Sequence, residues 1–274
     1  MNIKSYILGL GALSMVALSS CDTENVRSIY VNPTAGLTFL TAEQQESFSE
    51  SATDLLFNVD VVRQNSEGEA SVKLVSTYLK VNAQGKLEEA SWNDDITIPS
   101  AVTFKDGETM ASFQISLSDD IQQGIKHYVN VALDTKEAPV DANMSKLLTI
   151  SRAYIYGELM EKNLSSTWFS EGHEGAPVNK TVKIQQGTQN KMLYRTINTY
   201  KSNDADKNNY PMIITLSTDK DGKKVAKVAE TQVDANLTAS GEGEWDDDKI
   251  SLTMKFVDTK NKKEYSDLKE VFSR

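Results

Sequence analysis

The sequence is poor in the residues that metal sites and covalent active sites require. Its single cysteine, Cys21, permits no intrachain disulfide, so packed cores must stabilise the fold. It has two histidines, His127 and His173, far apart in the sequence, whereas a zinc site usually draws on several histidine or cysteine ligands. His173-Glu174 begins like a zincin motif, but Pro177 stands where the second histidine is needed. The Gly-x-Ser-x-Gly elbow and the Gly-Lys-Ser/Thr phosphate loop are absent. We therefore expect no metal, no cofactor and no catalytic nucleophile.

Basic residues are also too few to balance the acids. Lysine and arginine number 29 against 39 aspartates and glutamates, which gives a formal net charge of −10. Binding to nucleic acid or to anionic lipid headgroups needs basic residues that displace counterions. The charge therefore argues against nucleic acid as a partner.

Long apolar runs are missing beyond the N-terminus. The one such run covers residues 6–18, after Lys4 and before Ser19 and Ser20. It is shorter than the roughly 20 residues that a transmembrane helix needs. A positive charge, an apolar run and small residues in this order are typical of a signal peptide. We expect residues 1–20 to be removed.

Leu18-Ser19-Ser20-Cys21 resembles the lipobox of bacterial lipoproteins. The resemblance implies that Cys21 becomes the N-terminus and carries diacylglycerol on its sulfur, often with a further acyl chain on its amine. Each buried acyl CH₂ contributes about 0.8 kcal/mol, and two or more chains anchor stably, so the lipid bilayer is the expected partner. The alternative is an ordinary signal peptide with an incidental cysteine at its edge. Residues 21–35 lack periodicity and are interpreted as a lipid-anchored tether.

Alternation of apolar and polar residues dominates the chain beyond residue 35. In residues 55–62, Phe57, Val59 and Val61 share one face of a predicted strand. Further strands are predicted at residues 36–41, 72–81, 102–104, 112–117, 128–133 and 147–155. Lys105-Asp106-Gly107-Glu108 predicts a hairpin, because Asp-Gly tolerates positive φ. Short strands at this spacing predict an antiparallel sandwich over residues 36–156.

A second domain is predicted from Gly157 to the end, residues 157–274, with the boundary at Tyr156-Gly157. Strands are predicted at residues 181–186, 193–198, 212–218, 224–229, 232–237 and 249–257. Asp219-Lys220-Asp221-Gly222 predicts a hairpin, and residues 241–246 are expected to bend at their two glycines. Short loops favour an up-and-down meander curled into a lipocalin-like barrel or half-barrel. The expected fold class is all-β: an immunoglobulin-like sandwich followed by an antiparallel meander or barrel-like domain.

The first domain resembles a Calx-β or immunoglobulin-like module. The resemblance rests on residues 102–108, on the strand that ends in Leu117-Ser118-Asp119-Asp120, and on residues 128–133. Calx-β domains of ion exchangers bind calcium through clustered carboxylates, which makes Asp119 and Asp120 calcium candidates. The acids expected downstream are replaced by a stretch that includes Lys126, and calcium takes about six to eight oxygen ligands. A solvated loop is the favoured interpretation.

The whole chain is similar to surface lipoproteins of Bacteroidetes that are encoded beside glycan-uptake machinery. Asp22 and Glu24, just after Cys21, resemble that group's surface-export signal. The resemblance implies an extracytoplasmic protein on the outer membrane, facing the cell surface. In enterobacteria an aspartate after the cysteine implies retention at the inner membrane instead.

Three tryptophans, Trp92, Trp168 and Trp245, are the candidate ligand-binding residues because each lies among polar residues. Sugar C–H faces pack on aromatic rings, and sugar hydroxyls bond to polar neighbours. The alternative is that each tryptophan anchors the core of its own domain.

The leading hypothesis is a non-enzymatic surface lipoprotein that binds a glycan or an outer-membrane protein partner in nutrient uptake or adhesion. An extracytoplasmic hydrolase of the glycosidase type, with a carboxylate pair that sequence cannot identify, is one alternative. A structural spacer, in which the first domain holds the second away from the membrane, is the other.

Overall fold

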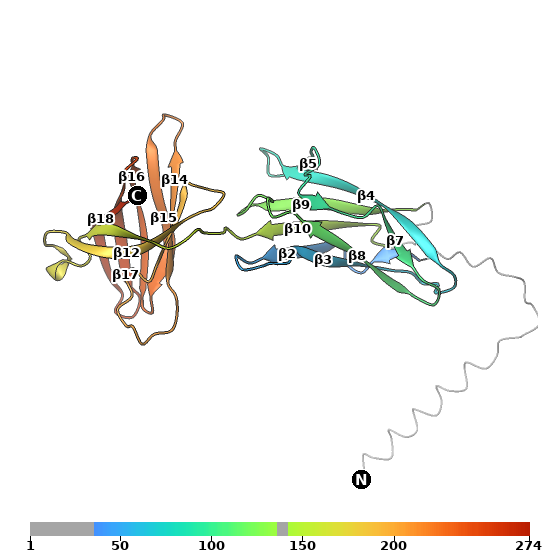
Figure 1. The fold of residues 1–274 in the computed structure, drawn as a ribbon, viewed down its shortest axis with the longest axis horizontal. Helices are drawn as coiled ribbons and strands as arrows, with labels where there is room; N and C mark the ends of the chain where they lie inside the picture. Colours follow the sequence, from blue (N-terminus) through green and yellow to red (C-terminus); the bar gives the residue numbers. More distant parts are fainter. Residues whose placement is uncertain (1–35, 136–141) are drawn as a thin grey trace, which may run out of the picture.

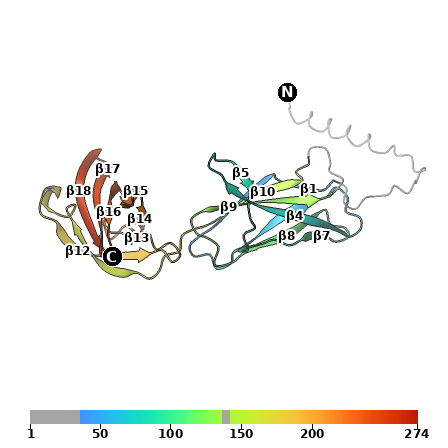
Figure 2. The same cartoon turned by 90° about the horizontal axis from the view of Figure 1, so that it is seen from above.

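The computed structural model describes residues 36–135 and 142–274, and regular structure in these ranges is β-strand apart from the 3-10 turn η2 (Glu171–His173). The predicted signal peptide, Cys21 and the tether lie outside the described residues. Nothing in the described ranges forms a helix of the length and apolar character that crossing a bilayer requires. Figures 1 and 2 show two β units joined by a short segment, and the fold is all-β as predicted.

The first unit is a sandwich of two sheets. One sheet has the strand order β1-β3-β8-β6, and the other has the order β2-β10-β9-β4-β5, with β7 also paired to β4. Neighbours are antiparallel except β2 and β10, which run parallel. The strand bounds are β1 (Thr38–Phe39), β2 (Glu43–Phe48), β3 (Leu56–Val62), β4 (Ala70–Val81), β5 (Leu87–Glu89), β6 (Ile96–Thr97), β7 (Ala101–Phe104), β8 (Met110–Leu117), β9 (Lys126–Asp134) and β10 (Ser145–Arg152).

The predicted alternation is confirmed in β3, where Phe57, Val59 and Val61 are buried in the core between the sheets. An alternating strand buries one face against the opposite sheet and exposes the other. The same pattern in β8 buries Phe113 and Ile115. This core explains why the unit needs no disulfide.

The predicted hairpin at residues 105–108 is wrong in its connection. A turn is present, with Gly107 at φ +84°, but β7 and β8 belong to different sheets, so the turn carries the chain across the sandwich. The cause is Arg63, which is 3% exposed. Its guanidinium donates to the carbonyl oxygens of Lys105 at 2.9 Å and Glu108 at 2.7 Å, and also to those of Ser66 and Gly68. A buried cation needs these acceptors, and they fold the turn around it.

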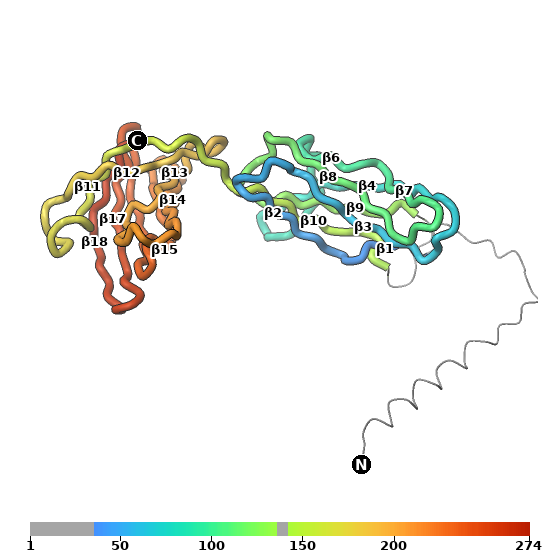
Figure 3. Tube along the Cα trace, turned by 60° about the horizontal axis from the view of Figure 1, so that its bottom comes forward, coloured from blue at the N-terminus to red at the C-terminus, as the bar shows by residue number. Residues whose placement is uncertain are grey.

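The second unit is a closed barrel of eight antiparallel strands in sequence order, as its predicted meander implied. β11 pairs with β18 to complete the ring, and Figure 3 traces the first strand beside the last. The bounds are β11 (Met160–Ser166), β12 (Val178–Gln186), β13 (Leu193–Ile197), β14 (Pro211–Thr218), β15 (Lys224–Asp234), β16 (Leu237–Trp245), β17 (Lys249–Asp258) and β18 (Lys263–Ser273).

The predicted bend at residues 241–246 is wrong, because residues 241–245 belong to the regular strand β16 and the chain turns only from Asp246. Gly241 and Gly243 lie where an added Cβ would collide with the Met254 sulfur and the Ser251 carbonyl oxygen. The glycines therefore permit close strand packing and do not mark a turn. The strand predicted at residues 232–237 is also wrong, since it straddles the turn between β15 and β16.

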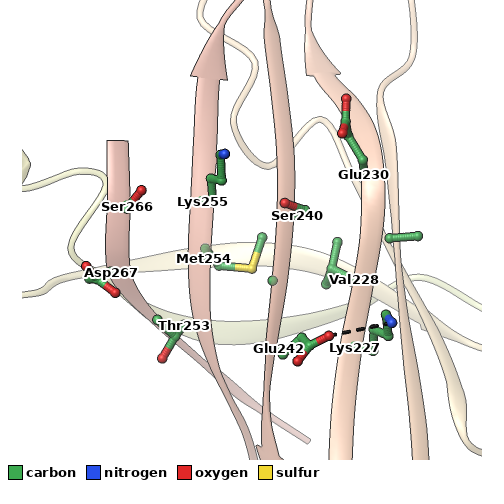
Figure 4. Close-up of a pocket in the computed structure, with 12 residues that line it drawn as sticks. Lys227, Val228, Glu230, Ser240, Glu242, Thr253, Met254, Lys255, Ser266 and Asp267 are labelled. Carbon is green, nitrogen blue, oxygen red and sulfur yellow. Dashed lines mark ion pairs between the residues drawn. The ribbon is translucent and has the colours of Figure 1, made fainter. Parts of the chain in front are cut away.

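Two β-bulges lie in one row across the barrel wall. Residues 229 and 230 of β15 both lie opposite Ser240 of β16. Ser240 pairs with Lys255 of β17, and residues 266 and 267 of β18 both lie opposite Lys255. Bulges bend a strand and increase its twist, which a small barrel needs in order to close. A groove of about 450 Å³ follows this row (Figure 4), and its Lys227 and Glu242 form an ion pair of 3.5 Å.

The segment between the two units is held by side chains from both. Arg195 of β13 makes a bidentate ion pair with Glu50 at 2.6 and 2.9 Å, and its guanidinium carbon lies 3.9 Å from the centre of the Tyr156 ring. The Gln189 amide accepts from the Gln123 backbone N–H at 3.0 Å. Bidentate, half-buried pairs of this kind fix geometry better than single surface pairs do.

Candidate ligand cavity at the barrel mouth

One end of the barrel holds a cavity of about 300 Å³, which we call the mouth cavity. Its walls come from the segments after β11 and β13, the β15–β16 turn, the end of β17 and the start of β18. These segments all lie on one rim because the strands alternate in direction around an up-and-down barrel. The lining residues are Trp168, His173, Tyr200, Ser202, Asp234, Asn236, Leu237, Asp258 and Tyr265.

An aromatic stack forms one wall of the mouth cavity. Trp168 lies between His173, at 4.2 Å and 15° between ring planes, and Phe256, at 4.4 Å and 26°. Two rings this close and this nearly parallel must occupy opposite faces of the indole. Tyr265 stands perpendicular to Trp168 at 5.4 Å. Trp168 therefore presents its edge, and its faces are used within the protein.

His173 is held in a backbone conformation that residues other than glycine rarely adopt. Its φ is +64° and follows +62° at Gly172. Such strain costs about 1–3 kcal/mol and persists where surrounding contacts enforce it. Here the Trp168 stack does so, together with a 2.5 Å hydrogen bond between Nδ1 of His173 and the Trp168 carbonyl oxygen. A carbonyl oxygen only accepts, so Nδ1 carries the proton of this bond.

Two aspartates bring carboxylate oxygens to the cavity. Asp234, 8% exposed, accepts from the Ser202 hydroxyl at 2.5 Å and from the Ser202 backbone N–H at 3.1 Å. Asp258 accepts from the backbone N–H of Asn261 at 2.9 Å and from its side-chain amide at 2.8 Å. These bonds, the backbone one first, hold the pKa of Asp258 below its usual value. The cavity is acidic at neutral pH.

A third carboxyl, Glu270 of β18, lies beneath the aromatic wall and is fully buried. It accepts from the Ser166 hydroxyl at 2.7 Å, the Tyr200 hydroxyl at 3.1 Å and the Trp168 backbone N–H at 3.3 Å. Burial raises the pKa of Glu270 to about 7, although the three donors lower it. Burial, and then Glu270, also raise the pKa of Tyr200 well above its usual value. Perturbed carboxyls beside a cavity are a common property of functional sites.

The three candidate tryptophans do not form one site. Trp245 lies at the other end of β16, donates from Nε1 to the Ser217 carbonyl oxygen at 3.0 Å, and has Lys224 Nζ 4.5 Å from its ring centre. Its cross-strand partner Ile250 lies six residue steps along β17, about 20 Å at the usual rise, from Phe256, which stacks on Trp168. Trp92 belongs to the sandwich, where it is 39% exposed. Only Trp168 lines the mouth cavity.

Of the two calcium candidates, Asp119 contacts the guanidinium of Arg152. Arg152 donates from Nη1 to the Asp119 carbonyl oxygen at 2.7 Å, and its Nη2 lies 3.5 Å from the Asp119 carboxylate, while Asp120 is exposed. Within residues 36–135 and 142–274, no three His, Cys, Asp or Glu side chains are grouped as a metal site would need. The other histidine, His127, is buried between the Tyr78 hydroxyl and the Gln122 carbonyl oxygen, each at 3.0 Å.

The sequence patterns do not identify His173, Glu270, Asp234 or Asp258 as residues of a ligand site. A signal for Glu270 was present, because it interrupts the apolar alternation of Leu268 and Phe272. The assembly of the aspartates could not be read in this way, since each belongs to an ordinary polar turn.

No protein-family model matches the chain, and no curated protein matches it. Among solved structures it is similar to an auxiliary nutrient binding protein from Bacteroides thetaiotaomicron, with 10% identity, 85% of this chain and 89% of that chain covered, and a TM-score of 0.36. It is also similar to a Bacteroides ovatus protein provisionally named as carbohydrate binding, with 14% identity, 77% and 70% coverage, and a TM-score of 0.33. The apo form of the Calx CBD1 domain gives 19% identity, 42% and 95% coverage, and a TM-score of 0.29. These scores are too low for a residue of the cavity to be assigned from a relative.

Proposed function

We propose that this chain is a lipid-anchored, extracytoplasmic binding protein that captures a small glycan-derived ligand in the mouth cavity without converting it. The anchor is inferred from the lipobox-like sequence that ends at Cys21. Its location on the outer membrane, facing the cell surface, is part of the same proposal. The observation that carries the binding role is the mouth cavity itself, whose lining combines an aromatic wall with polar groups.

The chemistry of the mouth cavity suits a sugar. Each sugar hydroxyl can donate to a carboxylate and accept from an amide. Asp234 and Asp258 supply the carboxylates, and Asn236 supplies the amide. Tyr265 and the edge of Trp168 offer apolar contact to the C–H groups of a pyranose. The volume is at the small end of the roughly 300–1,000 Å³ range of ligand sites, which favours one terminal sugar unit.

The test is a glycan array followed by titration calorimetry on residues 21–274 with Cys21→Ser, which prevents lipidation. Asp258→Asn should weaken binding of the array hit about tenfold or more, because hydrogen bonds to charged groups contribute about 1.5–3 kcal/mol. Asp246→Asn is the matched control. Asp246 accepts similar turn bonds from the Asp248 and Lys249 backbone N–H groups, both at 2.9 Å, but at the opposite rim. Equal affinity of both variants, or no glycan bound, would contradict the proposal.

A glycosidase is the second candidate, because two carboxylates line the mouth cavity and a third lies beneath it. The general acid must be protonated and must reach the glycosidic oxygen. Glu270 has a raised pKa but is fully buried and does not line the cavity, and the pKa of Asp258 is lowered. New reducing ends from the array hit, lost in Asp234→Asn or Asp258→Asn, would establish hydrolysis in place of simple binding.

A further inference from the structure

Glu270 connects two walls of the mouth cavity without lining it. Its Oε1 accepts from the Ser166 hydroxyl and the Trp168 backbone N–H, and its Oε2 accepts from the Tyr200 hydroxyl. Trp168 and Tyr200 line the cavity, whereas Ser166 belongs to the barrel interior. A change in the hydrogen bonds of this one buried carboxyl therefore reaches two residues that line the mouth cavity.

The direction of the Tyr200 bond depends on the charge of Glu270. An ionised carboxylate only accepts, so the Tyr200 hydroxyl must point its proton at Oε2. A protonated carboxyl must donate, and a buried donor without a partner is costly. With Oε1 already engaged by two donors, the proton belongs on Oε2, where the Tyr200 oxygen at 3.1 Å is its acceptor. The Tyr200 proton is then released from this bond.

We propose that Glu270 is a positioning residue that sets whether Tyr200 offers the ligand a hydrogen-bond acceptor or a hydrogen-bond donor. The ligand part of this inference rests on the mouth cavity being the binding site. When Glu270 is ionised, the Tyr200 hydroxyl donates its hydrogen bond to the carboxylate and can only accept from a ligand. When Glu270 is protonated, Tyr200 can donate to a sugar oxygen. Because Asp234 and Asp258 already supply acceptors to the cavity, the added donor makes affinity for a neutral sugar higher when Glu270 is protonated.

Glu270 changes its charge near neutrality. Its pKa is about 7, raised by burial. Tyr200 stays neutral there because its own pKa is raised. Asp234 and Asp258 face the cavity from β15 and β17, and His173 stacks on the far side of Trp168. Two lysines lie nearby without lining the cavity. Lys269 is exposed next to Glu270 on β18, and Nζ of Lys180 is 3.7 Å from the Phe169 ring centre.

The first test needs no ligand. In residues 21–274 with Cys21→Ser, the backbone amide resonance of Trp168 is followed by NMR from pH 5.5 to 8.5, because this N–H donates to Glu270. We expect a titration with a midpoint near 7 that disappears in Glu270→Gln. It should persist in His173→Gln, which removes the imidazole stacked on Trp168, and in the exposed control Glu264→Gln. A flat wild-type curve, or the same curve in Glu270→Gln, would overturn the inference.

The second test measures binding of glucose, galactose, mannose and N-acetylglucosamine at pH 6 and pH 8. Glu270→Gln imitates the protonated state, since its side-chain amide can donate to the Tyr200 oxygen while its carbonyl accepts from Ser166 and Trp168. Wild type should bind about three- to tenfold more tightly at pH 6, the size of one net hydrogen bond. Glu270→Gln should keep the pH 6 affinity at both pH values. If a sugar binds but its affinity changes neither with pH nor with Glu270→Gln, the inference about Glu270 is refuted and the proposed function stands. If no sugar binds, the proposed function is refuted, and the NMR titration decides the inference about Glu270.

Discussion

Glu270→Gln should stabilise the barrel at high pH and leave it nearly unchanged at low pH. An ordinary glutamate has a pKa of 4.5, and the buried Glu270 has a pKa of about 7. Between these values the folded state holds a proton that the unfolded state has lost, so stability decreases as pH increases through this window. Below pH 4.5 the loss is absent, and above pH 7 it is complete.

The magnitude follows from the difference between the two pKa values, 7 − 4.5, or about 2.5 units. At 1.36 kcal/mol for each unit, ionising Glu270 costs about 3 kcal/mol of folding free energy at pH 8 and above. A neutral glutamine keeps most of the hydrogen bonds without this cost. For a unit of this size, we expect the melting temperature of Glu270→Gln to exceed that of wild type by roughly 10 °C at pH 8.

Thermal and urea denaturation of both proteins from pH 4.5 to pH 8.5, followed by near-ultraviolet circular dichroism, measures the difference directly. The exposed Glu264→Gln is the control for loss of a negative charge, and its difference from wild type should show no such rise with pH. Our reasoning is refuted if Glu270→Gln is less stable than wild type at pH 8, or if its stability difference does not depend on pH.

Three further predictions concern other parts of the molecule. Cys21→Ala should release the protein from the membrane fraction or leave its signal peptide uncleaved. If cell fractionation shows that the variant is processed normally and still retained on the membrane, lipidation of Cys21 is contradicted. Arg195→Ala removes the ion pair to Glu50 and should broaden the range of arrangements of the two units; small-angle scattering identical to that of wild type would show that the pair does not hold the joint. Trp245→Ala should lower the melting temperature by several degrees and leave glycan affinity unchanged, because its ring packs against the barrel core between Lys224 and Arg274. A loss of affinity without a loss of stability would make Trp245 a ligand platform instead.

The strands could be predicted from the sequence wherever alternation was regular. Phe57, Val59 and Val61 show why: a strand buried on one face must place its apolar residues two apart. The same reasoning fails at Gly241 and Gly243, because a glycine that permits close strand packing looks the same in sequence as one that permits a turn. Arg63 shows a second limit: two of its four carbonyl acceptors lie 42 and 45 residues further along the chain, and such partners cannot be inferred from a single charged residue.

The candidate site was harder to predict than the fold. Trp168 was identified as a ligand-binding candidate, and it does line the mouth cavity, but with an edge and not a face. His173, Asp234 and Asp258 meet only because the barrel brings one end of several strands to a single rim. Their assembly on one rim depends on closure of the barrel between β11 and β18, and no local sequence pattern encodes that closure.

The measurement that bears most directly on the proposed function is chemical-shift mapping with the best glycan from the array on the chain from residue 21. Our account predicts that the largest changes cluster at Trp168, His173, Asp258 and Tyr265. Changes confined to the sandwich around Trp92, or to the groove along the two bulges, would show that the ligand binds elsewhere and that the mouth cavity is not its site.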